Sequence, residues 1–289
     1  MKCFYHATDL DGQCSGAIVR QEFPECELIG ITYSDTFSWN IIEPNETIIL
    51  VDFALQPFED MLKLGKTCDL IWIDHHLSAI EESERHGFRP KGWWKIGEAA
   101  CELTWKYFVS PDLPLAVYLI GRHDVWDHSD VRTLAFHYGM QKHSTQPSED
   151  EFWRDLLYDS DCERLIDSFI KDGNIILEYV RRDNAKYVKA CSFDVILDDY
   201  RCIAANKMLC GSQLFESVWD EDKYDIMLAF GYKNGRWNIS LYTDKDDIDV
   251  SQIAKKWGGG GHKGAAGFQA DTLPFLPSKR TRSQYKPQV

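Results

Sequence analysis

The chain has 289 residues, enough for two domains of ordinary size, and 44% of them are hydrophobic, enough to form buried cores. Its formal net charge of −14 argues against a protein that tracks long duplex DNA, since such proteins usually carry a basic face. No apolar run approaches the roughly 18 residues of a membrane span, and the N-terminal residues do not form a signal peptide. We therefore expect a soluble, cytoplasmic protein with no membrane partner.

Nine cysteines are scattered along the chain, and no two form a CxxC pair. This pattern disfavours both a disulfide framework and a zinc knuckle. We expect ordinary thiols in a reducing compartment.

The first third of the chain alternates short apolar runs with helical patterns. The runs predict strands at residues 2–6, 27–32, 47–51 and 69–73, with helices at 12–23 and 57–64. Strands that alternate with helices indicate an α/β fold with a parallel sheet and helices on its faces.

The rest of the chain is helical at first and then changes texture. Helices are predicted at 98–108, 115–120 and after Pro147, and residues 161–188 form one long helix or two. Beyond Cys191 we predict strands at 193–197, 201–205, 225–230 and 236–242, with helices at 209–218 and 250–257. We predict a first domain over 1–173, a linking helix over 174–191, a smaller α/β domain over 192–272 and a disordered tail over 273–289.

Acidic and histidine side chains follow three of the predicted strands. Because ligands bind beyond the carboxyl ends of parallel strands, we expect these side chains to meet at one edge of the sheet. Mixed imidazole and carboxylate ligands suit Mn²⁺, Co²⁺, Zn²⁺ or Fe²⁺, and a set of this size is ample for two ions that bind phosphate oxygens. The side chains are His6, Asp9 and Asp11 after the first strand, Asp52 after the third, and Asp74, His75 and His76 after the fourth.

A further polar segment follows the apolar helical run at 115–120. Asp124 in this segment is a candidate to complete the metal shell. Asp127, His123 and His128 are alternatives that the residue pattern alone does not rank.

Four consecutive glycines, Gly258, Gly259, Gly260 and Gly261, precede His262 and Lys263. Glycines expose backbone N–H groups and allow an anion to approach closely. We predict that this segment contacts the substrate. It is not a P-loop, because the chain contains no GxxxxGK[ST] pattern.

Four motifs together resemble the DHH phosphoesterase superfamily with its appended DHHA1 domain. They are HATDLDG at 6–12, VDF at 51–53, DHH at 74–76 and GGGGHKGAAGF at 258–268, and they occur in the order that the family has. The resemblance implies a larger parallel-sheet DHH domain and a smaller α/β DHHA1 domain, with the active site in the cleft between them. It also implies two divalent metal ions, with Mn²⁺ first and Mg²⁺ or Co²⁺ as alternatives.

The resemblance further implies a role for each matching residue. One ion is bound by His6 and Asp9 and the other by Asp11, while Asp52 bridges the two. His75 and Asp124 are further ligands, His76 faces the phosphate, and Asp74 orients its neighbours. The clamp on the substrate consists of Gly258, Gly259, Gly260, Gly261 and His262.

These features predict a manganese-dependent phosphohydrolase of the phosphodiesterase or exonuclease type. Its expected substrates are short single-stranded oligonucleotides or small nucleotides, hydrolysed by two-metal activation of water. One alternative is an enzyme that resembles an inorganic pyrophosphatase or polyphosphatase, and another is a nucleotide-binding sensor without activity. The choice between RNA, DNA and nucleotide, the direction of cleavage and the oligomeric state stay open, with a dimer as one alternative.

Overall fold

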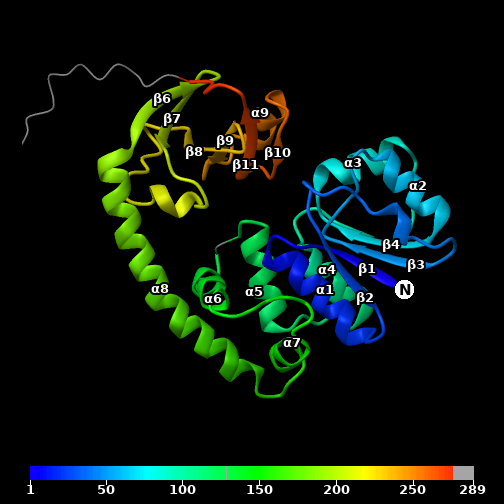
Figure 1. Cartoon of the computed structure of the whole chain (residues 1–289). Helices are drawn as coiled ribbons and strands as arrows, with labels where there is room; N and C mark the ends of the chain where they lie inside the picture. The colour runs from blue at the N-terminus through cyan, green and yellow to red at the C-terminus, as the bar shows by residue number, and fades with distance from the viewer. Residues whose placement is uncertain (128, 276–289) are drawn as a thin grey trace, which may run out of the picture. The chain divides into compact units, whose positions relative to one another are not determined.

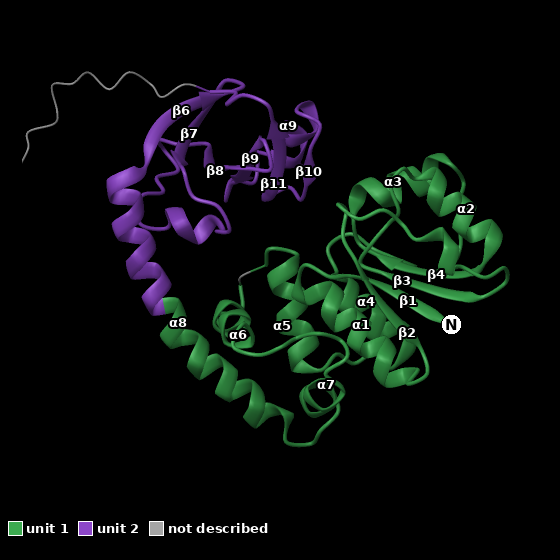
Figure 2. Ribbon diagram, viewed as in Figure 1, with its two compact units in different colours: residues 1–177 green, residues 178–289 purple. Residues whose placement is uncertain are grey.

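The computed structural model describes residues 1–127 and 129–275. It divides into two compact units, residues 1–177 and 178–289, which are coloured separately in Figure 2. The division falls within a single helix, α8 (Cys162–Cys191). This helix begins before residue 174, where the predicted linking helix starts.

Unit 1 is built on a five-stranded sheet in which every neighbouring pair is parallel (Figure 1). The strand order is β2-β1-β3-β4-β5, so β1 lies between its sequence neighbour β2 and the later strand β3. The order of the strands reverses at this point, and in such sheets a ligand site forms beyond the carboxyl ends of the two strands concerned. The strands are β1 (Lys2–His6), β2 (Glu27–Ile31), β3 (Thr47–Val51), β4 (Asp69–Asp74) and β5 (Lys91–Trp94).

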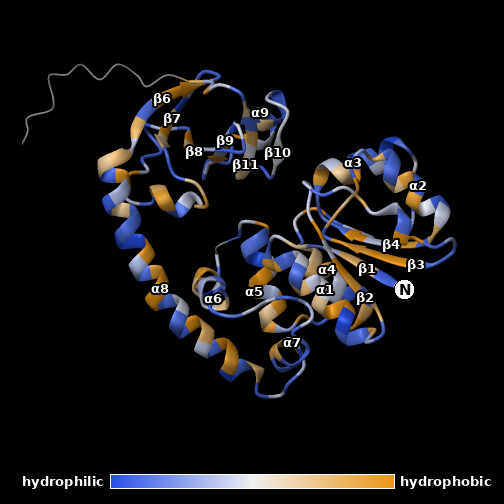
Figure 3. Cartoon of the chain, viewed as in Figure 1, coloured by the Kyte–Doolittle hydropathy of each residue, from blue (hydrophilic) through white to orange (hydrophobic). Residues whose placement is uncertain are grey.

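Helices cover both faces of this sheet. Successive residues of a strand point to opposite faces, so each strand contributes apolar side chains to both layers of helices. Leu50 and Trp72 face the layer that contains α2, whereas Val51 and Ile73 face the layer that contains α1 and α4. Figure 3 shows the central strands as hydrophobic, which fits a sheet that is buried on both faces. The helices are α1 (Leu10–Glu22), η1 (Trp39–Ile41), α2 (Glu59–Thr67), α3 (Leu77–Arg85), α4 (Ala100–Phe108), α5 (Leu115–Asp124), α6 (Arg132–Met140) and α7 (Asp150–Leu157).

Unit 2 contains a mixed six-stranded sheet with the order β10-β11-β9-β8-β7-β6. In the part of unit 2 up to residue 275, β7 and β8 are the only paired strands that run parallel. Two tight hairpins shape it, and both central residues of each turn have positive φ: 47° and 71° at Asp198 and Asp199, and 54° and 83° at Asn234 and Gly235. The elements are β6 (Phe193–Leu197), β7 (Tyr200–Ala205), η2 (Ser212–Phe215), β8 (Ile226–Lys233), β9 (Arg236–Tyr242), α9 (Val250–Lys256), β10 (Gly260–Gly261) and β11 (Ala265–Ala270).

The predicted α/β class and the parallel sheet are confirmed, but the structure differs from the sequence-based expectation at several places. The helix expected over 209–218 is only the short 3-10 turn η2. Helix α3 and strand β5 were not expected. Leu273 and Phe275, assigned to a disordered tail, pack on the core of unit 2, while residues 276–289 lie outside the described part of the chain. Within the described residues, no helix combines the length and apolar character that crossing a membrane requires.

Candidate metal centre

The end of β1 and the start of α1 form one side of the centre. Asp9 caps α1, where its Oδ1 accepts a hydrogen bond of 3.0 Å from the N–H of Gly12. Its other oxygen, Oδ2, lies 3.0 Å from Nδ1 of His6. A Cβ atom at Gly12 would lie 2.1 Å from the carbonyl oxygen of His6. Only glycine therefore allows the start of α1 to lie this close to the end of β1.

Asp11 is the second residue of α1, is buried, and ties α1 to α4. Its Oδ2 accepts a hydrogen bond of 2.8 Å from the N–H of Ala100, and its Oδ1 accepts one of 2.7 Å from Cys101. These are the first two N–H groups of α4, where a helix terminus favours negative charge. These two hydrogen bonds hold the side chain of Asp11 in place beside His75, whose Nε2 lies 3.6 Å from its Oδ2.

Asp52 stands immediately after β3, and its φ of 54° is unusual for a residue other than glycine. The side chain is buried between two imidazoles. Its Oδ2 lies 3.5 Å from Nδ1 of His6, and its Oδ1 lies 3.4 Å from Nε2 of His75. Asp52 thus joins the group at the end of β1 to the group at the end of β4.

Asp74, His75 and His76 follow one another at the end of β4 but point differently. Asp74 Oδ1 accepts hydrogen bonds from the N–H groups of His75 and His76, at 2.7 and 3.2 Å, and lies 2.7 Å from Nδ1 of His76. His75 is buried, whereas His76 is partly exposed. Asp74 therefore orients the His76 ring, while His75 faces the buried carboxylates.

Asp124 is the last residue of α5, and its side chain lies at the centre. Its Oδ2 lies 3.3 Å from Nε2 of His75. Arg122, two residues earlier, donates a hydrogen bond of 2.7 Å to the buried carboxylate of Glu102 on α4, which holds this end of α5 in place. Asp127, one of the alternatives to Asp124, instead lies 3.4 Å from Nη1 of Arg122.

The other two alternatives to Asp124 are His123 and His128. His123 stacks on His137, with ring centroids 3.6 Å apart. His128 lies outside the described residues. Asp124 belongs to the centre because its Oδ2 lies beside Nε2 of His75.

The imidazoles of the centre attract protons strongly. Burial lowers the pKa of His6, but Asp52 and the neighbouring carboxylate outweigh this effect and raise it to about 10. Burial also opposes charge on His76, yet Asp74 raises its pKa to about 9. The pKa of His75 is raised as well, by Asp52 above all, against the effect of burial.

The carboxylates divide into two kinds. Burial raises the pKa of Asp11 and that of Asp124, and the other negative charges close to each of them raise it further. The pKa of Asp124 reaches about 7. Burial opposes charge on Asp52 too, but His6 and His75 lower its pKa below the usual range. The centre thus holds more negative charge than its surroundings stabilise, and it binds protons to offset that charge.

These residues fit a pair of divalent cations. His6, Asp9 and Asp52 offer ligand atoms within 4.8 Å of one another, and so do Asp11, Asp52 and His75. Asp52 belongs to both groups, as a bridge between two ions would. Within the described residues, four buried atoms at the centre have no hydrogen-bond partner of normal geometry: Nδ1 of His6, Oδ1 of Asp52, Oδ2 of Asp74 and Oδ2 of Asp124. The nitrogen and oxygen donor set is one that Mn²⁺ or a similar cation accepts.

Tyr33 is a residue at this centre that the sequence did not single out. It follows β2 at the same edge of the sheet, with 51% of its surface exposed. Its ring centroid lies 4.5 Å from that of Phe53, 5.5 Å from that of His6 and 6.4 Å from that of His76. The feature of the sequence that could have identified Tyr33 is its position directly after the strand predicted at 27–32.

The glycine segment is built differently from the expectation. The N–H of Gly258 donates to the carbonyl of Lys255, and the N–H of Gly259 donates to that of Ala254, so both amides complete the end of α9. Gly260 and Gly261 form β10 and pair with β11. The N–H groups of Gly258 and Gly259 are therefore already bonded within unit 2, and the contact of this segment with substrate stays a prediction.

Comparison with solved structures shows which fold the chain has. It aligns with a pGpG-specific phosphodiesterase from Vibrio cholerae over 93% of this chain and 92% of that one, with a TM-score of 0.53 and 12% identity. It also aligns with a DHH domain described as a member of a family of ribosomal proteins, over 92% and 81% of the two chains, with a TM-score of 0.58 and 14% identity. The chain has the DHH phosphoesterase fold. No family model matches the sequence.

One curated relative of this DHH-fold chain is an uncharacterized protein of Acanthamoeba polyphaga mimivirus. It is 26% identical over an alignment of 235 residues, and the match covers 78% of this chain. The match spans about half of that relative, 53% of its length.

Proposed function

We propose that this chain is a divalent-metal-dependent phosphoesterase that hydrolyses short oligonucleotides or small nucleotides. The observation that carries the proposal is the position of Asp52 in two ligand groups, one with His6 and Asp9 and one with Asp11 and His75. A pair of adjacent cation sites at the carboxyl edge of a parallel sheet suits the binding of a phosphoryl group.

Each residue of the centre has a role in this proposal. Two bound divalent ions, Mn²⁺ in our proposal, would lower the pKa of water and neutralise charge on the phosphoryl oxygens. Asp52 would hold the two sites at a fixed separation, because its oxygens face opposite imidazoles. Asp124 would add a ligand beside His75.

His76 is the residue that we assign to the phosphate itself. Asp74 accepts from its Nδ1 side and favours the charged ring, whose pKa is about 9. A charged His76 would offer its Nε2–H to a phosphoryl oxygen and would stabilise the charge that develops there. Asp74 would act on the substrate only through His76, as a positioning residue.

The choice of a nucleotide substrate rests on two further observations. Tyr33 presents an exposed ring beside His6 and His76, where a base could stack. The aligned Vibrio cholerae enzyme is described as specific for pGpG, a dinucleotide. We also assign substrate contact to the segment of Gly258 to Gly261 and to His262, as a second contact region in unit 2.

A panel of phosphate compounds tests this proposal. Turnover would be measured on a dinucleotide, a nucleoside bisphosphate and pyrophosphate, each with Mn²⁺, Mg²⁺, Co²⁺ or excess EDTA. We expect metal-dependent hydrolysis of the dinucleotide or the bisphosphate, with Mn²⁺ the best cofactor, and much slower turnover of pyrophosphate.

Two other outcomes would overturn it. Turnover of pyrophosphate at least as fast as that of the dinucleotide would favour a pyrophosphatase-like enzyme. Tight nucleotide binding without hydrolysis in any of the metals would favour a sensor.

A further inference from the structure

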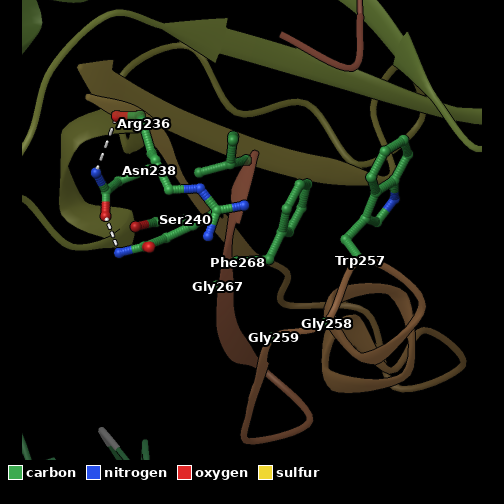
Figure 4. Close-up of a pocket in the computed structure, with 10 residues that line it drawn as sticks. Arg236, Asn238, Ser240, Trp257, Gly258, Gly259, Gly267 and Phe268 are labelled. Atoms are coloured by element: carbon green, nitrogen blue, oxygen red, sulfur yellow. Dashed lines mark hydrogen bonds between the residues drawn. The ribbon is translucent and has the colours of Figure 1, made fainter. Parts of the chain in front are cut away.

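Unit 2 contains a pocket of about 640 Å³ beside the glycine segment (Figure 4). It lies on β9 and β11, where the two-residue strand β10 leaves most of the outer edge of β11 uncovered. Its volume is within the range of small-molecule sites, roughly 300–1,000 Å³. Every lining residue belongs to unit 2.

Arg236 supplies the positive charge of this pocket. Its Nε donates to Asp271 at 2.9 Å, an ion pair whose two side chains are 48% and 85% exposed. Exposed ion pairs of this kind contribute little to stability, so an incoming anion can compete for the guanidinium. No hydrogen bond is recorded for its Nη1 and Nη2 groups within the described residues. Figure 4 shows the guanidinium group on the side of Asn238 and Ser240, turned toward Phe268.

Two aromatic rings form the opposite wall. Trp257 stacks on Phe268, with centroids 5.4 Å apart and planes 15° apart. Its Nε1 donates to Asp198 at 3.2 Å, which fixes the indole in place while 37% of Trp257 stays exposed. A fixed, partly exposed indole is a surface on which a planar base can stack.

Gly258, Gly259 and Gly267 also line this pocket. A Cβ atom at Gly259 would lie 2.1 Å from the carbonyl oxygen of Gly267, and Gly258 has a φ of +77°. Because the amides of Gly258 and Gly259 already bond to α9, an anion here needs another donor. Arg236 is a donor with the geometry for it, since a guanidinium fork binds two phosphate oxygens at once.

Side-chain amides complete the lining. Gln269 donates from Nε2 to Oδ1 of Asn238 at 3.0 Å, which leaves the carbonyl oxygen of Gln269 on the pocket side as an acceptor. Asn238 makes one long contact, 3.4 Å, from Nδ2 to the carbonyl of Arg236. The pocket thus combines a cation, a stacking surface and amide donors and acceptors, which are the groups that recognise a phosphate, a base and the polar edge of that base.

We propose that this pocket binds a nucleoside monophosphate group, with its phosphate on Arg236 and its base against Trp257. The choice of a nucleotide as ligand rests on the proposed function. The group is either a free mononucleotide or one end of a short oligonucleotide, and the two share this chemistry.

Calorimetric titration of the full chain in EDTA tests the inference without any turnover. Wild-type protein is titrated with AMP, a dinucleotide, adenosine and ribose 5-phosphate. Arg236→Ala is expected to weaken AMP binding by about tenfold or more, the loss of one charge-assisted bidentate contact, and Arg236→Lys by less. Trp257→Leu is expected to weaken AMP and adenosine but to leave ribose 5-phosphate unchanged.

Arg181→Ala is the matched control. Arg181 also lies in unit 2, is 50% exposed and donates from Nε to a carboxylate, that of Glu216, at 3.1 Å. This control variant should bind AMP within about twofold of wild type, a difference of less than 0.5 kcal/mol. A dinucleotide that shifts together with AMP identifies an oligonucleotide end as the ligand, whereas a shift with AMP alone identifies a free nucleotide.

The inference and the proposed function fail in different ways. Equal affinities in Arg236→Ala and Arg181→Ala, or no AMP binding by wild-type protein, would overturn the pocket assignment whatever the chain hydrolyses. Binding of AMP through Arg236 by a chain that hydrolyses none of the phosphate compounds would support the pocket and overturn the proposed activity.

Discussion

Nδ1 of His76 lies 2.7 Å from Oδ1 of Asp74, a buried carboxylate that also accepts from the backbone N–H groups of His75 and His76. The Asp74→Asn substitution removes the charge that orients the His76 ring. We expect kcat to fall by about 10–100-fold with little change in KM, the usual effect of losing an outer-shell partner. Steady-state kinetics on a dinucleotide measures this split.

A double-mutant cycle then separates positioning from a direct role. If Asp74 acts through His76, adding Asp74→Asn to His76→Ala should cost little further activity. Independent, additive losses in the double variant would show that Asp74 works in another way.

Metal content gives a test that does not depend on turnover. Equilibrium dialysis against Mn²⁺ should leave two ions bound to each wild-type chain. His75→Ala should retain fewer, since His75 stands among Asp11, Asp52 and Asp124. His86→Ala, a histidine whose recorded ion pair is with Glu82 on α3, should keep both ions. A wild-type chain that binds no Mn²⁺ would contradict the assignment of the centre.

Tyr33 should affect substrates that contain a base and spare those that do not. Tyr33→Ala is expected to raise KM for a dinucleotide by about tenfold, within the 1–3 kcal/mol that stacking of one base contributes. Tyr33→Phe should stay close to wild type, because the ring remains. Tyr179→Ala removes a ring that is 71% exposed on α8 and serves as the control. An equal loss with pyrophosphate would indicate that Tyr33 supports the fold of the centre rather than the base.

The stability of unit 2 should depend on acid through Asp225. Hydrogen bonds from Arg201, at 2.9 and 3.1 Å, lower the pKa of Asp225 well below its usual value, and Lys245 adds to the effect. A lowered pKa in the folded state contributes stability that is complete above the unfolded pKa, about 3.9, and is lost as pH falls toward the folded value. Asp225→Asn should therefore destabilise the protein by about 2 kcal/mol at pH 7 and by less at pH 3.

Urea unfolding at the two pH values measures this difference. Asp247→Asn, at an exposed position of unit 2, is the control and should change the stability little at either pH. A destabilisation by Asp225→Asn that is the same at pH 7 and pH 3 would contradict the account.

The sequence predicts most of unit 1 because its strands carry strong local signals. Residues 48–51 form an unbroken apolar run after Thr47, and the predicted bounds of this strand match β3. Strand β5 is only four residues long and contains Gly92, so its pattern is too short to identify. The apolar residues at 209–218 suggested a helix, but Leu214 and Phe215 pack into the core of unit 2 from a 3-10 turn instead. Tertiary packing overrides helix propensity there.

The centre was predictable in its residue types but not in its connections. The carboxyl ends of β1, β3 and β4 are brought together by the parallel register, which the alternation of strands and helices already indicates. No local pattern shows that Asp11 bonds to Ala100, because 89 residues separate the two. The exposure of Tyr33 and the bonded amides of Gly258 depend on packing in the same way.

The most direct test of the central claim is the turnover of a dinucleotide with Mn²⁺ by Asp52→Asn. The substitution keeps the shape of the side chain, and asparagine tolerates the φ of 54° found at this position. Asp199→Asn, at a turn residue with a φ of 71°, is the matched control and should keep full activity. We predict that Asp52→Asn loses more than about 100-fold in kcat, beyond the range typical of outer-shell partners. Activity close to that of Asp199→Asn would contradict the claim that Asp52 joins two cation sites.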